Sequence, residues 1–193
     1  MPARVLRTPM TIAVLGLLAE RPRHTYDMRV AMRERGHDRM LEIKNASLYD
    51  ALRRLASAGL VEAGATIRDS ARPERTVYHL TSAGEQRLLE WLREVLGDPA
   101  HDRTAFMSAL MFMYALPRTE VADLVMRRAR LLQEEIDASE AAIGAAKARG
   151  VEAVFLSEDA YAQALRRSEC DWLLAFADDL REQRLTWPER TLT

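Results

Sequence analysis

Polar and basic side chains cluster in one short stretch of the sequence, and their chemistry suits contacts with nucleic acid. They are Lys44, Asn45, Ser47, Tyr49, Arg53 and Arg54. Asn45 and Ser47 are types that cap helices, and three leucines follow at helical spacing, so we expect a helix here that Gly59 closes. Short polar side chains at the start of such a helix can contact base edges in a major groove of DNA, and positive ones can contact phosphates. The alternative is an ordinary amphipathic helix with a solvated basic face.

A second basic group lies where the periodicity of the sequence changes. Residues 60–67 and 76–80 are rich in β-branched and aromatic types, which is typical of short strands. The polar segment between them holds Pro73 and three arginines, Arg68, Arg72 and Arg75. We therefore predict a β-hairpin with a basic tip that could hold phosphates or enter a minor groove. A charged loop that is merely solvated is the alternative.

Further helices would position these two groups. The first starts directly after Thr8, since Thr is a good N-cap and the proline that follows is tolerated at the first helical position. Another starts near Thr25, and a last one follows the hairpin from Thr81 to Gly97. The order helix, helix, helix, hairpin, helix is that of a winged helix-turn-helix domain, which we assign to residues 1–97.

Beyond residue 97 the sequence is almost entirely helical in pattern. Between residues 119 and 149 there is no proline and apolar residues recur at heptad-like spacing, which predicts one long helix with a seam for a second copy. We assign residues 98–193 to an all-helical dimerisation domain, and the whole chain to a mainly α fold of the α+β class. The residues expected at the dimer interface are Val121, Val125, Leu132, Ile136, Trp172 and Phe176.

Composition separates the two halves of the chain. Residues 1–80 hold 14 Lys and Arg against 9 Asp and Glu, a net charge of +5, whereas residues 81–193 hold 14 against 20, a net charge of −6. A basic front half is consistent with one end meeting a polyanion. A single cysteine, Cys170, fits a reducing compartment, and the longest apolar run is too short for a membrane span. We therefore expect a cytoplasmic protein.

The sequence offers little support for catalysis or metal binding. It has no glycine-rich phosphate loop, no nucleophile elbow and no convergent set of His, Asp and Glu side chains. Its 4 histidines fall on different expected elements, without an i, i+4 pair or a cysteine partner. We therefore expect no enzymatic activity, no metal and no cofactor.

Three separated motifs resemble the PadR family of bacterial regulators. They are MTIAVLGLLAERPRHTYDM, NASLYDALRRLASAGLVEA and RPERTVYHLTSAGEQRLLEWL. The departures are Thr25 for Gly, Ser47 for Thr, and Asp50 where the family often has Pro; Asp50 adds a negative charge beside the expected DNA face. The resemblance covers residues 1–96. The second half is loosely similar to the longer subfamily, whose C-terminal helices mediate homodimerisation.

The resemblance implies a homodimer that binds a pseudo-palindromic DNA site and represses, or sometimes activates, a nearby gene. The residues expected to contact DNA are Tyr26, Lys44, Asn45, Ser47, Tyr49, Arg53, Arg54, Arg72, Arg75 and Thr76. The alternative function is a winged-helix module that binds a protein partner and not DNA, which Asp50 and the overall acidity favour slightly.

The resemblance also implies a response to a small molecule, because many members of the family bind a small aromatic or hydrophobic effector. The residues expected to line such a pocket are Trp91, Phe106, Met107, Met111 and Phe112. Flat rings and adaptable thioethers suit such a ligand. A stripe of Met and aromatic side chains is, however, more often plain core.

Overall fold

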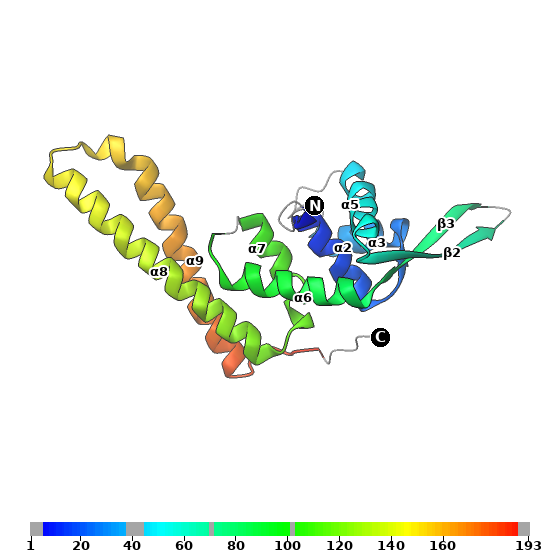
Figure 1. Cartoon of the computed structure of the whole chain (residues 1–193). Helices are drawn as coiled ribbons and strands as arrows, with labels where there is room; N and C mark the ends of the chain where they lie inside the picture. The colour runs from blue at the N-terminus through cyan, green and yellow to red at the C-terminus, as the bar shows by residue number, and fades with distance from the viewer. Residues whose placement is uncertain (1–5, 38–44, 70–71, 101–102, 189–193) are drawn as a thin grey trace. The chain divides into compact units, whose positions relative to one another are not determined.

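The computed structural model describes residues 6–37, 45–69, 72–100 and 103–188 (Figure 1). These residues form two compact units. The first unit holds the described residues up to Val95 and those from 103 to Leu116, and the second holds Leu96–Ala100 and Pro117–Trp187. Among the described helices, none is both long enough and apolar enough to cross a lipid bilayer.

Helix α2 (Pro9–Glu20) is enclosed by the rest of the first unit. Its residues from Met10 to Leu18 are all buried, so it is apolar on every side, as a central helix must be. Thr8 caps it: the Thr8 Oγ1 accepts a hydrogen bond from the Thr11 N–H at 3.1 Å, and the Thr11 Oγ1 accepts one from the Thr8 N–H at 2.8 Å. The predicted first helix is confirmed.

Helices α3 (Thr25–Glu34) and α5 (Asn45–Ser57) form the helix-turn-helix pair. Each buries one face. The face of α5 is the leucine stripe that the sequence predicts, Leu48, Leu52 and Leu55, and it packs toward α2. Gly59 follows α5 with φ 71°, a left-handed conformation that glycine adopts at low cost. Both predicted helices are confirmed.

A hairpin of β2 (Val61–Asp69) and β3 (Arg72–Leu80) forms the predicted wing. The strands are antiparallel, and Val61 lies opposite Leu80 at the base. A third strand, β1 (Arg23–His24), pairs with β3 and gives the sheet order β1-β3-β2. The predicted two-stranded wing is confirmed. The added strand β1 was not predicted, because two residues leave no alternating pattern to detect.

Helix α6 (Ser82–Gly97) starts in close contact with the base of the wing. Thr81 links the two, since its Oγ1 accepts a hydrogen bond from the Gly84 N–H at 3.0 Å and donates one to the Gly59 carbonyl at 2.8 Å. A Cβ atom placed at Gly84 would overlap the carbonyl oxygen of Leu60. Only glycine therefore fits at this position.

Helix α7 (Arg103–Leu110) and the 3-10 helix η1 (Met113–Ala115) complete the first unit. α7 packs against α2, and the ring of Phe112 lies directly on Gly16, where any Cβ atom would overlap it. This division differs from the predicted boundary after residue 97, because α7 packs against α2 and residues 103–116 belong to the first unit.

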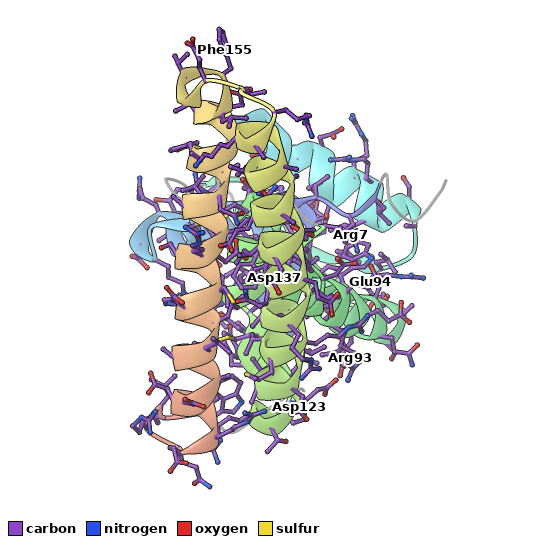
Figure 2. All side chains as sticks on the ribbon, turned by 90° about the vertical axis from the view of Figure 1, so that its left-hand side faces the viewer. Arg7, Arg93, Glu94, Asp123, Asp137 and Phe155 are labelled. Carbon is purple, nitrogen blue, oxygen red and sulfur yellow. The ribbon has the colours of Figure 1, made fainter. Side chains whose placement is uncertain are left out.

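The second unit is an antiparallel pair of long helices, α8 (Arg118–Ala148) and α9 (Ser157–Arg181), joined through the 3-10 helix η2 (Ala153–Leu156). Figure 2 shows the pair side by side, with Phe155 at the end where η2 connects them. The predicted long helix from 119 to 149 and the mainly α fold class, a winged helix-turn-helix followed by helices, are confirmed.

Ion pairs fix the register of α8 and α9. Arg128 is only 2% exposed, and its Nε donates a hydrogen bond to Glu169 Oε1 at 2.7 Å while its Nη1 donates one to the Asp98 carbonyl at 2.6 Å. Arg167 also pairs with Glu140 across the two helices. The buried guanidinium is thus matched by two acceptors, as a charge in a protein interior requires.

Candidate nucleic-acid interface

Two tyrosines are exposed on the helix-turn-helix pair. Tyr26, near the start of α3, is 60% exposed, and Tyr49, in the first half of α5, is 59% exposed. The other large apolar and aromatic side chains whose burial is described in the first unit are buried or half-buried. An exposed phenol can lie on a sugar and hydrogen-bond a phosphate, which makes both positions suitable for a nucleic-acid contact.

The start of α3 is fixed by His24, which the sequence analysis missed. Its Nδ1 accepts a hydrogen bond from the Asp27 N–H at 3.2 Å, and its Nε2 lies 3.2 Å from the Asp27 carboxylate. Nδ1 must therefore be unprotonated, with the ring proton on Nε2. The ring centroids of His24 and Tyr26 lie 6.4 Å apart. Histidine is not among the usual N-cap residues, so the sequence held no signal for this cap.

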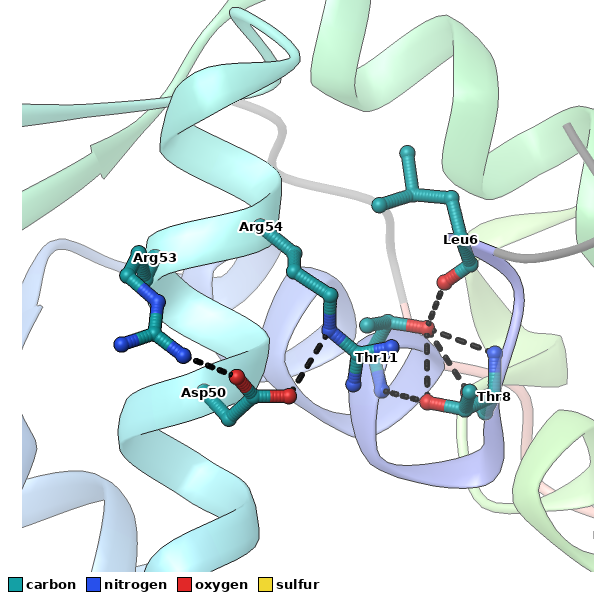
Figure 3. A network of polar contacts seen from close by, with 6 residues as sticks. All are labelled: Leu6, Thr8, Thr11, Asp50, Arg53 and Arg54. Carbon is teal, nitrogen blue, oxygen red and sulfur yellow. Dashed lines mark hydrogen bonds and ion pairs between the residues drawn. The ribbon is translucent and has the colours of Figure 1, made fainter. Parts of the chain in front are cut away.

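Three charged residues contact one another on α5 (Figure 3). Asp50 Oδ1 accepts a hydrogen bond from Arg53 Nη2 at 2.5 Å, and Asp50 Oδ2 lies 3.0 Å from Arg54 Nε. The side chains are 77% exposed for Arg53, 42% for Asp50 and 34% for Arg54. One carboxylate therefore faces two guanidinium groups, and the cluster keeps one net positive charge.

The other residues predicted to contact DNA are less fully described. Lys44 lies outside the described residues. For Asn45 and Ser47 in the first turn of α5, and for Arg72 and Arg75 in β3, the structure describes the backbone alone. Thr76 is half-buried in β3, opposite Thr66 of β2. Contacts of these residues with DNA stay predictions.

A polar cluster around Glu20, at the end of α2, supports the helix pair. The Glu20 carboxylate accepts hydrogen bonds from Arg23 at 2.6 Å, Arg35 at 2.5 Å and the Tyr114 hydroxyl at 2.6 Å. Burial alone would raise the pKa of Glu20, but these hydrogen bonds outweigh it and hold that pKa below its usual range. Burial, together with the Glu20 carboxylate, raises the pKa of Tyr114 far above that of a free phenol. The cluster ties β1, the end of α3 and η1 to α2.

The five residues predicted to line an effector pocket all belong to the first unit. Trp91 is 2% exposed, Phe106 5% and Phe112 1%, whereas Met107 and Met111 are half-buried. Phe112 also meets the ring of His37 edge-on, with 5.7 Å between centroids. The three rings are therefore part of the core of this unit, and their role in binding an effector stays a prediction.

The six residues predicted at a dimer interface fall into two groups. Four of them, Val121, Val125, Leu132 and Ile136, are at most 3% exposed within the single chain. The heptad pattern of α8 thus serves the core of the second unit, because the chain's own helices cover it. Trp172 is 45% exposed, Phe176 is half-buried, and their rings stack with centroids 4.7 Å apart. A place for these two rings at a dimer interface stays a prediction.

Solved structures of PadR proteins show a weak likeness. Bacillus subtilis PadR in complex with operator DNA is 21% identical, with a TM-score of 0.39 and coverage of 88% of this chain and 98% of that one. The same protein in complex with p-coumaric acid is 20% identical, with a TM-score of 0.37 and coverage of 90% and 99%. These TM-scores are too low to support an argument.

Sequence comparison gives a firmer result. The negative transcriptional regulator PadR of Bacillus subtilis (strain 168) is 30% identical over 112 residues, which are 58% of this chain. The chain spans 60% of the length of that relative. The model of the Transcriptional regulator PadR-like family matches residues 14–90, which include the helix-turn-helix pair and the wing. Residues 14–90 are therefore similar to the PadR-like family of transcriptional regulators.

Proposed function

We propose that this chain binds DNA and acts as a homodimeric transcriptional repressor. The observation that carries the proposal is the pair of exposed tyrosines, Tyr26 on α3 and Tyr49 on α5, within the region that matches the family. In a helix-turn-helix the second helix lies in the major groove and the first crosses the backbone. Both tyrosines therefore lie on helices that meet DNA. The Bacillus subtilis relative is named a negative transcriptional regulator, which favours repression.

The wing and the start of α5 are proposed to complete the contact. Asn45 and Ser47 belong to the leading end of the recognition helix, where short side chains reach base edges, and Lys44 precedes them in the sequence. Arg72, Arg75 and Thr76 belong to β3 of the wing, where the arginines would neutralise phosphates. The phosphate contacts supply affinity and the contacts of α5 supply sequence preference.

The proposal is tested by selecting sites for the full chain from a random duplex library and measuring the affinity for the selected site at several salt concentrations. Tyr49→Ala and Arg72→Ala should each weaken binding, and Arg72→Ala should also flatten the salt dependence. Arg87→Ala on α6, which removes an arginine of the same unit outside the proposed interface, is the control. If no sequence is enriched and no salt-dependent binding occurs, the proposal is wrong and the protein-interaction module takes its place.

Homodimerisation is proposed to use the outer side of α9. Four aromatic or aliphatic side chains recur there at spacings that place them on one side of the helix, Tyr161, Leu165, Trp172 and Phe176. Three of them are 68%, 49% and 45% exposed in chain order, and Phe176 is half-buried. Apolar side chains in such a row are typical of a surface that a protein covers. A second copy of this chain is the partner that a pseudo-palindromic site requires.

Release by a small aromatic effector is the last part of the proposal. The rings of Trp91, Phe106 and Phe112 and the neighbouring thioethers could adapt to a flat apolar ligand. The probe is p-coumaric acid, added to the complex of the protein with its selected site. It should lower the affinity for DNA in the native chain and leave Trp91→Ala unaffected. If neither p-coumaric acid nor other small aromatic acids shift the affinity, or if Trp91→Ala keeps the shift, an effector does not act here.

A further inference from the structure

We infer that Asp50 and Arg53 together read one G·C base pair in each half-site, an inference that rests on the proposed DNA binding. Both residues lie on α5, the proposed recognition helix, three positions apart. Their side chains are 42% and 77% exposed and joined by the 2.5 Å hydrogen bond from Arg53 Nη2 to Asp50 Oδ1 (Figure 3). A hydrogen-bond donor and an acceptor are therefore presented next to each other on the helix.

This pair of groups complements the major-groove edge of a G·C base pair. Guanine presents two acceptors there, N7 and O6, and the paired cytosine presents the N4 amino donor beside them. The guanidinium of Arg53 can donate to both guanine atoms while the carboxylate of Asp50 accepts from the cytosine amino group. An A·T pair presents an amino donor where the guanidinium would lie and the thymine O4 acceptor where the carboxylate would lie. An A·T pair therefore offers Arg53 a single acceptor, N7, in place of two, and it offers Asp50 no donor.

Asp50 is held in place from its other side as well. Its second oxygen, Oδ2, lies 3.0 Å from Arg54 Nε, and Arg54 is the less exposed of the two arginines. A carboxylate held between two guanidinium groups presents its oxygens in a fixed position on α5. At a base pair that offers no amino group to the Asp50 carboxylate, the protein binds DNA less tightly. Asp50 is thus expected to give sequence specificity and to lower the affinity for DNA of arbitrary sequence.

The test is a selection of binding sites from a random duplex library with three full-length proteins: the native chain, Asp50→Ala and Arg53→Gln. The native chain should select a motif with a G·C pair at one defined position of each half-site. Both variants should lose that preference by about tenfold at the same base pair, with the other positions unchanged. Asp50→Ala should also bind random-sequence DNA several-fold more tightly and with a steeper salt dependence, because two arginines are freed for phosphates.

Glu90→Ala is the matched control for added charge. Glu90 pairs with Arg87 on α6 at 3.0 Å, also three residues apart and also on the surface of the first unit. It should leave the selected motif unchanged. Thermal unfolding of each variant shows that the chain is folded, which is expected because Asp50 and Arg53 are exposed.

The possible outcomes distinguish a failure of the inference from a failure of the proposed DNA binding. If both variants select the native motif at every position, or if they change different base pairs, Asp50 and Arg53 do not act as a pair and the inference is wrong. A rise in affinity for random DNA without any change of the motif also overturns it, since Asp50 would then act by charge alone. If the native chain selects no motif, the proposed function itself fails.

Discussion

The two units of this chain differ in what they leave on their surfaces. Among the side chains whose burial is described, the large apolar or aromatic ones that are exposed in the first unit are two tyrosines, Tyr26 and Tyr49. The second unit exposes Phe155, Leu165 and Trp172, which are 67%, 49% and 45% exposed, among others. The first unit thus exposes two rings that carry hydroxyl groups, whereas the second exposes a longer series of side chains, most of them apolar.

This difference indicates two kinds of neighbour. A ring with a hydroxyl group suits a hydrated, polar surface such as a phosphate backbone. A row of apolar side chains is stabilised only where another protein covers it and removes it from water. The interiors differ in the same sense, because α2 is buried on all sides while α8 buries a single stripe. One chain therefore joins a first unit with an enclosed central helix to a second unit made of a pair of long helices.

The largest effect that we predict concerns the enclosed first unit. Gly84→Ala should destabilise it by about 2–4 kcal/mol, because the new methyl group overlaps the Leu60 carbonyl oxygen and the start of α6 must move. Gly144→Ala, in the exposed part of α8 with open space around it, should stabilise the second unit by roughly 0.5–1 kcal/mol. Urea unfolding followed by circular dichroism measures both. Equal midpoints for the Gly84→Ala and native chains would contradict the close approach.

The next effect concerns self-association through the second unit. Trp172→Ala should weaken the dimer by about 2 kcal/mol, roughly thirtyfold in the dissociation constant, because central aromatic residues dominate protein interfaces. Leu174→Ala is the control, since Leu174 is 42% exposed on the same helix but two positions on, away from the side that carries Trp172. Sedimentation equilibrium measures both variants. If Leu174→Ala dissociates the dimer and Trp172→Ala does not, the interface lies on the other side of α9.

A smaller effect is expected for the tyrosine of α5. Tyr49→Phe removes one hydroxyl group from an exposed ring and should lower the affinity for the selected site about fivefold, which corresponds to about 1 kcal/mol for a hydrogen bond. The unfolding midpoint should not change. Tyr161→Phe, the same substitution on the second unit, keeps the aromatic ring that the proposed dimer surface uses and should leave the DNA affinity unaltered. Fluorescence anisotropy with a labelled duplex is the measurement, and equal losses for the two variants would remove the distinction between the units.

The smallest effect is a pH dependence that belongs to the first unit. The pKa of Glu20 is lowered in the folded chain, so its contribution to stability is present above the ordinary pKa of a glutamate, about 4.3, and is lost as the pH falls through the lower folded value. Glu20→Gln should therefore be less stable than the native chain at pH 7 but lose less stability on acidification. Urea midpoints measured at several pH values down to about 3 show this as converging curves. Parallel curves would mean that Glu20 is not held by Arg35 and Tyr114.

Much of this architecture could be predicted from the sequence because its signals are local. Thr8 before a proline, the leucine stripe of α5 and the change of period at residue 60 each identify an element without reference to any other. The charged cluster on α5 could be predicted in the same way, because its members lie within one helix at i, i+3 and i, i+4 spacing. They are Asp50, Arg53 and Arg54.

The features that could not be predicted depend on contacts between distant residues. Glu20 and Tyr114 are 94 positions apart, and nothing in their types indicates that they meet. The heptad pattern of α8 shows that one stripe will be covered, but not whether a second copy or the chain's own α9 covers it. That is why Val121 and its neighbours were assigned to the dimer and are found in the core of the second unit.

The most direct test of the account is the affinity of the full chain for its selected duplex as a function of salt between about 50 and 200 mM. A DNA-binding homodimer should select a pseudo-palindromic site and bind it with an affinity that falls by two or more powers of ten over this range, with a shallower slope for Arg72→Ala. An affinity that is independent of salt, or a library from which no sequence is enriched, would contradict it.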